Sequence, residues 1–260
     1  MRNILFSGNV KVFDGILTGM LSIFMRTKST EPYRIYIFTM DVSHLREDFL
    51  PVSDEQIAFL NEVAKSYNKE NIVIKIDVTD IYKEEFAGCP NEGAYCSPYT
   101  LLRLFADKIP EIPDKLLYLD ADIICQGTIE PLINYTFSEH TVAMVVTEGQ
   151  KDWWAKRAHS LGVAGIANGY FNSGFLLINT AKWAAQQVSA RAIAMLNEPE
   201  VIKKITHPDQ DVLNMLLADK LVYSDIQYNT QFSLNYQLKE SFKNPVTNDT
   251  VFIHYIGPTK

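Results

Sequence analysis

Two carboxylates, Asp120 and Asp122, follow a short apolar run in the middle of the chain, and apolar residues resume directly after them. The run Leu116–Leu119 is continuous, which predicts a buried strand of a covered, mostly parallel sheet. Because an isolated charge inside such a sheet is costly, both carboxylates are expected at the end of the strand. In an extended segment residues i and i+2 face the same side, and hard divalent cations prefer oxygen ligands. The pair therefore predicts a metal site, with a helix cap or a turn as the alternative.

Three other polar side chains, two of them basic and one an imidazole, could belong to such a site. Arg103 lies in a mostly apolar segment expected to be helical, where it is either a core-edge residue or an anion clamp. His254 ends a predicted strand, and a single histidine there is more often structural than a ligand. Lys260 ends the segment 257–260, and such a terminal segment is more often a frayed tail than a binding loop. Taken singly, none of the three decides between structure and function.

A polar triplet, Asp209-Gln210-Asp211, precedes a predicted helix over residues 212–218. Acidic residues in the first turn of a helix interact favourably with its macrodipole, so capping explains Asp209 and Asp211. Capping does not explain Gln210, which leaves that residue as a candidate for another role.

The elements that would position these residues alternate along the chain. Strands are predicted over 3–7, 33–40 and 71–78, and helices over 12–27 and 53–67, where Ser53 and Gln56 form a capping box. This order predicts a parallel sheet wound as a nucleotide-binding domain. The later pattern predicts a helix from 98, a strand over 141–147, a partly helical 151–162, a turn at 169–174, a strand over 175–179, a helix over 180–196 and a strand over 251–255.

The turn after the first predicted strand is Ser7-Gly8-Asn9. It matches neither the dinucleotide GxGxxG pattern nor the GxxxxGK[ST] phosphate loop. Glycine beside a polar residue lets a ligand approach the backbone closely, although a plain strand-to-helix turn explains the residues equally well.

Composition narrows the class of protein. The 260 residues are 47% hydrophobic and 21% charged, as in an ordinary globular protein. A net charge of −7 argues against a general nucleic-acid binder. The three cysteines, Cys89, Cys96 and Cys125, lack CxxC spacing and predict free thiols in a reducing cytosol. No signal peptide and no membrane-spanning run is visible, so a cytoplasmic location is expected.

Four segments in order along nearly the whole chain resemble glycosyltransferase family 8, the retaining enzymes with a GT-A fold. The match is specific because all four occur together, whereas a DxD motif alone is weak. The segments are Leu117–Asp122 with its DxD motif, Tyr170–Asn179, Pro208–Asn214 with its DQD sequence, and the C-terminal HYxGxxK of His254–Lys260.

The resemblance implies that Asp120, Asp122 and His254 hold manganese, with magnesium as a second candidate. A mixed carboxylate and imidazole set is chemically sensible for manganese. The ion would bridge the diphosphate of a UDP-sugar, Lys260 would add positive charge there, and Gly257 would let the backbone come close.

The resemblance also implies contacts with the donor sugar. Arg103 would reach donor phosphate or sugar, Asp209 would hold sugar hydroxyls, and Gln210 would lie near the anomeric carbon on its β-face. Asn172 and Ser173 would contact sugar or ribose. The remaining expected donor contacts are Ser7, Gly8, Asn9 and Ala121.

The implied protein is a single GT-A domain over 1–260, with a nucleotide-binding half (1–125) and a half that faces the acceptor and closes on the diphosphate (126–260). Its implied reaction moves glucose or galactose from a UDP-sugar to a glycan or glycolipid acceptor, such as bacterial lipopolysaccharide. A self-glucosylating, glycogenin-like primer and a non-catalytic nucleotide-sugar-binding module are the alternatives.

Three features depart from the family pattern. The turn at Asn9 has no acid to contact uridine, and Glu148 is the candidate for an acid that the family often carries after a later strand. The family's basic, membrane-attaching tail would have to follow Lys260, so peripheral attachment to the inner membrane face depends on a segment outside this sequence.

Overall fold

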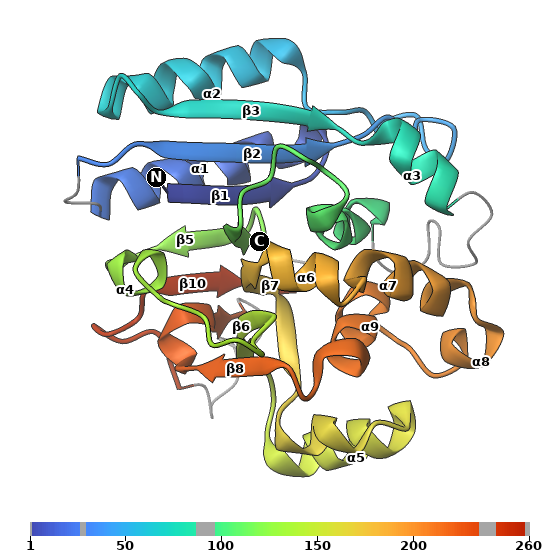
Figure 1. The fold of residues 1–260 in the computed structure, drawn as a ribbon. Helices are drawn as coiled ribbons and strands as arrows, with labels where there is room; N and C mark the ends of the chain where they lie inside the picture. The colour runs from blue at the N-terminus through green and yellow to red at the C-terminus, as the bar shows by residue number, and fades with distance from the viewer. Residues whose placement is uncertain (1, 27–29, 87–96, 234–242, 258–260) are drawn as a thin grey trace.

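A mostly parallel sheet forms the centre of the molecule (Figure 1). The computed structural model describes residues 2–26, 30–86, 97–233 and 243–257. Within these ranges, seven strands form one sheet in the order β3-β2-β1-β4-β7-β6-β8. They are β1 (Arg2–Ser7), β2 (Tyr33–Thr39), β3 (Ile72–Asp77), β4 (Lys115–Leu119), β6 (Ala143–Thr147), β7 (Phe171–Asn179) and β8 (Leu221–Ser224).

Strand β7 runs antiparallel to both of its neighbours, β4 and β6, while the other pairings in the sheet are parallel. The sheet therefore contains strands from both of the predicted halves of the chain, and the division at residue 125 stays a prediction.

A second sheet lies beside the first and was not expected from the sequence. Among the described residues it has three strands, β5 (Ile123–Cys125), β10 (Phe252–Tyr255) and β9 (Thr230–Phe232), in the order β5-β10-β9. Strand β10 pairs antiparallel with β5, with His254 opposite Ile123. This pairing brings the C-terminal strand against the residues that follow Asp122.

Alternate residues of the central strands fill two separate cores. On β1, Leu5 faces one core, and Ile4 and Phe6 face the other, which is the period of two expected for a sheet covered on both sides. The Ile4 side is covered by α1 (Phe13–Arg26), α2 (Asp54–Tyr67) and the small sheet. The Leu5 side is covered by the 3-10 helix η2 (Pro98–Asp107) and by α3 (Thr79–Phe86), α6 (Thr180–Ala185), α7 (Val188–Asn197) and α9 (Pro208–Leu217).

The predicted capping box of α2 is confirmed. Ser53 Oγ accepts the backbone N–H of Gln56, and the Gln56 side chain accepts the backbone N–H of Ser53. Both bonds satisfy donors that the first helical turn leaves without an intrahelical partner.

Two element predictions were wrong in detail. Residues 171–174 belong to β7 rather than to a turn, because Phe171 pairs with Thr147 beyond an irregularity in the register, where β7 has the extra residues. Residues 180–196 form two helices, since Gln187 takes a left-handed conformation (φ 51°) and both helices bond the Leu104 carbonyl, through Trp183 and Ser189. The helix predicted from residue 98 is present over residues 98–107, as a 3-10 helix.

Helix α5 (Lys151–Leu161) lies at one end of the molecule, apart from α1 and α2 (Figure 1). It packs with the 3-10 helix η3 (Ala164–Asn168) around a small third core that includes Leu161, Ile166 and Tyr170. The remaining short helices are η1 (Val10–Val12), α4 (Glu130–Ile133), α8 (Pro199–Ile202) and η4 (Ile226–Asn229).

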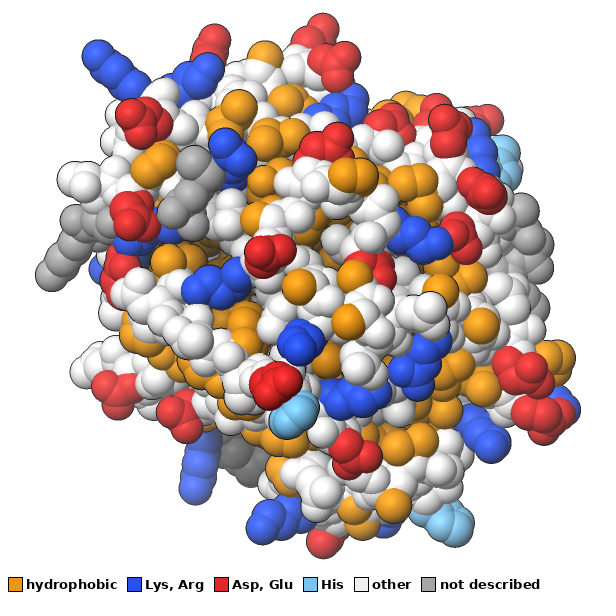
Figure 2. All heavy atoms as spheres, in the orientation of Figure 1, with side chains coloured by type: hydrophobic (Ala, Val, Ile, Leu, Met, Phe, Trp, Pro, Cys, Tyr) orange, Lys and Arg blue, Asp and Glu red, His pale blue; other side chains and the backbone are white. Residues whose placement is uncertain are grey.

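Acidic and basic side chains are interspersed over the face drawn in Figure 2, so the negative excess is not gathered there in one patch. None of the described helices combines the length and apolar character needed to cross a membrane. Cys125 is a buried free thiol whose pKa is raised to about 12 by burial. Cys89 and Cys96 lie outside the described residues.

Candidate active site

The Asp120–Asp122 segment is a turn between β4 and β5 and not an extended strand end. The backbone N–H of Ile123 donates to the Asp120 carbonyl (3.2 Å), and the N–H of Asp120 donates to the Gly174 carbonyl (2.9 Å). The expected i, i+2 geometry is therefore wrong, because the chain must reverse to enter the second sheet. The turn nevertheless brings the two carboxylates together.

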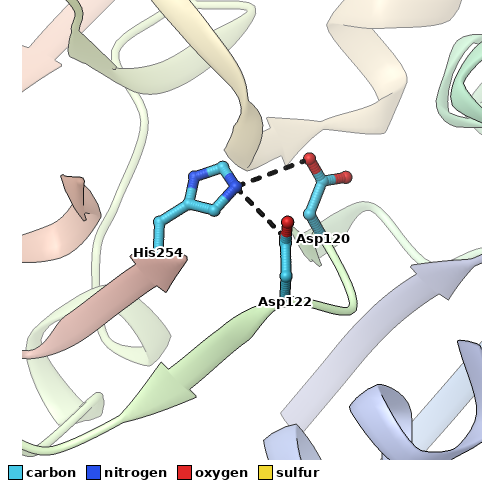
Figure 3. Close-up of side chains that lie close together, drawn as sticks. All are labelled: Asp120, Asp122 and His254. Carbon is cyan, nitrogen blue, oxygen red and sulfur yellow. Dashed lines mark ion pairs between the residues drawn. The ribbon is translucent and has the colours of Figure 1, made fainter. Parts of the chain in front are cut away.

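Asp120, Asp122 and His254 converge on one point and form what we term the Asp–Asp–His cluster (Figure 3). His254 Nε2 lies 3.1 Å from Asp122 Oδ1 and 3.9 Å from Asp120 Oδ2. One ligand atom from each residue fits within a group whose members are all within 4.8 Å of one another. Sequence separation hides this arrangement, which the β5–β10 pairing creates.

Asn229 orients the histidine of this cluster. Its Oδ1 lies 2.9 Å from His254 Nδ1, and its Nδ2 donates to Asn172 Oδ1 (3.1 Å). Since the Asn229 amide nitrogen already donates, its Oδ1 accepts the Nδ1 proton of His254. Nε2 is then the nitrogen with a free lone pair, which is the form that binds a metal.

Two glycines make room for the cluster. A Cβ on Gly174 would lie 2.5 Å from His254 Cε1 and 2.6 Å from Asp120 Oδ2. A Cβ on Gly15 of α1 would lie 2.2 Å from the Ala121 carbonyl oxygen. Any larger residue at these positions would displace the turn or the imidazole.

The donor set fits a divalent metal ion. Two carboxylates and an imidazole whose Nε2 faces them suit manganese or a similar cation. The group contains no thiolate, the soft ligand that would favour other metals. The cluster also holds two carboxylates close together, and a cation at their meeting point would relieve their repulsion. The described residues could therefore hold a divalent ion at this position.

A cavity of about 760 Å³ opens beside the cluster. Its wall is built by the ends of β1 and β4, by α1 and by η2. Of the residues singled out from the sequence, Ser7, Gly8, Asn9, Arg103, Asp120, Ala121 and Asp122 line it. This volume is in the range of pockets that enclose ligands of drug or cofactor size.

The first strand end contributes backbone and short polar side chains to the cavity wall. Ser7 Oγ lies 2.9 Å from the Tyr118 hydroxyl, and Asn9 Oδ1 accepts the backbone N–H of Lys11, which caps η1. Both side chains thus have partners within the protein, and their roles toward a donor stay predictions.

Arg103 is 3% exposed and connects the cavity wall to the interior. Its Nη2 lies 2.9 Å from Asp120 Oδ1 and its Nε 3.3 Å from Asp209 Oδ2, while Nη1 donates to the Ser173 carbonyl (2.6 Å). Its guanidinium also stacks 4.6 Å from the centre of the Tyr118 ring. Burial opposes its charge, but Asp120, Tyr118 and Asp209 outweigh that effect and raise its pKa.

Asp209 and Gln210 start α9 with their side chains buried against β7. Asp209 Oδ2 accepts the Ser173 hydroxyl (2.9 Å), so capping does not explain this residue. Gln210 Oε1 accepts the Ser173 N–H (3.1 Å) and the Asn172 Nδ2–H (3.2 Å). Asp211 does act near the helix start, since its Oδ2 accepts backbone N–H groups just ahead of α9.

Asn172 and Ser173 join these residues to the cluster. Asn172 Nδ2 also donates to Glu148 Oε2 (2.9 Å), which accepts the Gln231 amide as well (3.0 Å). The Asp–Asp–His cluster, Arg103, Asp209, Gln210, Asn172 and Ser173 thus form one hydrogen-bonded system. Gly257 follows His254 by three residues and has a φ of 101°, a conformation that favours glycine. Lys260 lies outside the described residues.

Four residues that contribute to this site were not predicted from the sequence: Tyr118, Asn229, Gly15 and Gly174. Tyr118 is fully buried and donates to Asp120 Oδ1 (2.6 Å), and burial raises its pKa far above the ordinary tyrosine value. A tyrosine inside an otherwise aliphatic strand was a usable signal, because a buried hydroxyl needs a partner. Nothing in the sequence near Asn229 pointed to His254.

The chain belongs to glycosyltransferase family 8. The sequence model of "Glycosyl transferase family 8" matches residues 13–260, which confirms the resemblance seen in the motifs.

Two curated relatives act on lipopolysaccharide according to their names. The chain is 81% identical over 162 residues to the lipopolysaccharide glucosyltransferase WaaO of Escherichia coli (strain K12), covering 62% of this chain and 47% of WaaO. It is 45% identical over 217 residues to the lipopolysaccharide 1,3-galactosyltransferase of Salmonella typhimurium, covering 84% of this chain and 62% of that protein. The matched part is thus less than two thirds of either relative's length.

The fold resembles that of the galactosyltransferase LgtC, solved with donor and acceptor sugar analogues. The TM-score is 0.76 at 20% identity, covering 100% of this chain and 88% of LgtC. At this identity the likeness shows the fold alone, and it confirms the expected GT-A architecture.

Proposed function

We propose that the protein is a retaining hexosyltransferase that moves glucose or galactose from a UDP-sugar to a hydroxyl group of a lipopolysaccharide glycan. The observation that carries the proposal is the Asp–Asp–His cluster at the edge of the 760 Å³ cavity, in a chain of family 8. The names of the lipopolysaccharide-modifying relatives support the acceptor class. The proposal places this work in the cytoplasm, at the inner face of the membrane.

Asp120, Asp122 and His254 would hold the metal ion, for which manganese is our first candidate and magnesium the second. When bound, such an ion neutralises charge that develops on a departing diphosphate. The chain's own part is to orient the three ligands, through the turn after β4, the pairing of β10 and the Asn229–His254 hydrogen bond.

Arg103 would fix the relative positions of the metal-binding turn and the sugar-binding residues. Its guanidinium bonds Asp120 in the turn and also bonds Asp209 and Ser173, so it fixes the position of the turn relative to the sugar-binding residues. Asp209 and Ser173 would then meet the hydroxyl groups of the donor sugar, and Ser7, Gly8, Asn9 and Ala121 the nucleotide end.

Retention would follow from attack on the same face that the diphosphate leaves. An amide is a poor nucleophile, so Gln210 is not suited to the covalent intermediate that retaining glycosidases form with a carboxylate. The Gln210 carbonyl would stabilise positive charge at the anomeric carbon, while an oxygen of the departing phosphate accepts the proton of the acceptor hydroxyl.

A panel of UDP-glucose and UDP-galactose tests this proposal, with truncated lipopolysaccharides as acceptors and with manganese, magnesium or a chelator. We expect transfer from one donor in the presence of metal, with the α-configuration kept in the product by NMR. Intact mass spectrometry in the same reactions detects hexose on the protein itself. Self-glucosylation without transfer, or donor binding without turnover on any acceptor, would overturn the proposal.

A further inference from the structure

A buried chain of hydrogen bonds runs from helix α5 to Gln210, and we term it the Gln210 network. Arg157 of α5 bonds Asp211 Oδ1, the Tyr170 hydroxyl donates to the same oxygen (2.5 Å), and Gln210 Nε2 donates to the Tyr170 oxygen (3.2 Å). Asp211 and Tyr170 are fully buried, and the Arg157 side chain is 13% exposed. Neither the metal site nor the predicted donor contacts use Arg157, Tyr170 or Asp211.

The direction of each bond in the network is fixed by chemistry. The backbone N–H of Ser173 can only donate, so the Gln210 atom facing it is the carbonyl oxygen. The amide nitrogen then faces Tyr170, whose oxygen accepts from it and whose proton goes to Asp211. A carboxylate accepts only, so the tyrosine proton cannot point back at Gln210.

Asp211 is held as a carboxylate by the donors around it. Besides Arg157 and Tyr170, the backbone N–H groups of Thr206 (2.7 Å) and His207 (3.0 Å) donate to its Oδ2. Burial favours the neutral form, but these donors outweigh burial and lower the pKa of Asp211. The acceptor that orients Tyr170 is therefore ionised at neutral pH.

Helix α5 supplies two further contacts that fix the Tyr170 ring. The Trp153 ring meets it edge-on with the ring centres 4.8 Å apart, and the Arg157 guanidinium lies 5.6 Å from its centre. Tyr170 is also part of the small third core beneath α5. The position of the tyrosine hydroxyl thus depends on how α5 packs.

We infer that Arg157, Asp211 and Tyr170 are positioning residues that set the orientation of the Gln210 side-chain amide. Without the Tyr170 acceptor, the NH₂ group of the amide loses its partner, and only the Ser173 N–H and the Asn172 amide still hold the carbonyl in its present orientation. A carbonyl stabilises positive charge at a sugar carbon, whereas an NH₂ group opposes it. The catalytic consequence rests on the proposed function, but the orientation itself does not.

Tyr170→Phe is the most direct test because it removes one hydroxyl and keeps the ring. We expect kcat for sugar transfer to fall about tenfold, equal to ~1.4 kcal/mol, with KM for the UDP-sugar nearly unchanged. Tyr36→Phe is the matched control, since Tyr36 is 1% exposed and its hydroxyl donates to the Glu111 carbonyl. Tyr36 lies on β2, which β1 and β4 separate from β7 in the sheet. We expect that control to leave kcat at the wild-type value.

A double-mutant cycle separates positioning from general loss of structure. In a Gln210→Ala background, Tyr170→Phe should lower kcat no further, because the amide that it orients is gone. Equal and additive losses in both backgrounds would overturn the inference. Arg157→Met should behave as Tyr170→Phe does, and Arg191→Met, which changes an exposed arginine, should have no effect.

NMR of the side-chain amide gives a readout that does not need activity. In protein labelled with ¹⁵N-glutamine, the Gln210 NH₂ signals are assigned by their loss in Gln210→Ala. We expect these protons to exchange slowly with solvent in the wild type and to shift and exchange faster in Tyr170→Phe. Unchanged signals would overturn the inference, whereas absence of transfer by the wild type would count only against the proposed function.

Discussion

The Asp–Asp–His cluster and the Gln210 network balance their charges in opposite ways. In the network, the Asp211 carboxylate is matched by Arg157 and by three further donors. In the cluster, Asp120 is bonded by Arg103 and by the Tyr118 hydroxyl, and both carboxylates face an imidazole whose Nδ1 proton is already bound. The protein itself supplies the donors that balance Asp211, whereas the geometry of the cluster suits a cation as a further partner of its carboxylates.

We therefore expect the two regions to respond differently to metal ions in solution. Groups that the protein has already paired contribute to stability regardless of added ions, and breaking them leaves a buried charge unmatched. Carboxylates that converge on a possible cation site gain further stability when a cation binds the folded protein. Arg103 bonds Asp120 of the cluster and also Ser173, whose N–H donates to Gln210, so its loss should have the largest effect.

Arg103→Met should lower the free energy of unfolding by about 3–5 kcal/mol, because it leaves the Asp120 and Asp209 carboxylates without their buried partner. Urea unfolding of the two proteins measures the difference. Arg191→Met is the matched control at an exposed arginine, and a loss of similar size there would contradict the assignment.

Manganese at about one hundred times its dissociation constant should raise the free energy of unfolding by ~2.7 kcal/mol, since only the folded cluster binds it. Thermal unfolding with manganese and then with excess chelator measures the change. Asp122→Asn should lose the response, and Asp249→Asn, at an exposed aspartate, should keep it. A response that survives Asp122→Asn would place the ion elsewhere.

Asn229→Leu should weaken manganese binding about tenfold, because His254 loses the acceptor that holds its Nδ1 proton and ring orientation. Isothermal titration with manganese provides the measurement. The matched variant Asn248→Ala, at an exposed asparagine, should bind as the wild type does. Unchanged affinity in Asn229→Leu would show that another contact orients the ring.

Gly15→Ala should destabilise the protein by about 1 kcal/mol, because overpacking against the Ala121 carbonyl exceeds the gain in helix propensity. Gly19→Ala is the graded comparison on the same helix, since its Cβ would lie 3.2 Å from the Ile123 carbonyl oxygen. We expect Gly19→Ala to be nearly neutral. Equal stability of the two variants in urea unfolding would refute the close fit of α1 to the turn.

The smallest effect concerns pH. The pKa of Asp211 is below its ordinary value in the folded protein, so its stabilising contribution is fully present above the unfolded pKa of about 3.9. That contribution is lost as the pH falls through the folded pKa. The stability difference between wild type and Asp211→Asn should therefore be constant above about pH 5 and shrink below pH ~4. A difference that grows on acidification would contradict this sign.

Local patterns were enough to predict much of the fold. The alternation of apolar runs and helical spacing located β1, β2, β3, α1 and α2. The capping box at Ser53 was predicted to the residue because its hydrogen bonds join positions three apart. The break at Gln187 was not predictable, because it depends on where two helices dock on the Leu104 carbonyl.

The family, the mostly parallel sheet and the residue types of the candidate metal site could be predicted from the sequence alone. These follow from motifs and periodicities that lie within short segments of the chain. Three features became visible only in the folded chain: the DxD segment is a turn, Asn229 orients His254, and Arg157 of α5 reaches Asp211. The physical reason is that hydrogen bonds and packing act between atoms a few ångströms apart, whatever their separation in sequence, and the second sheet and the packing of α5 set those distances.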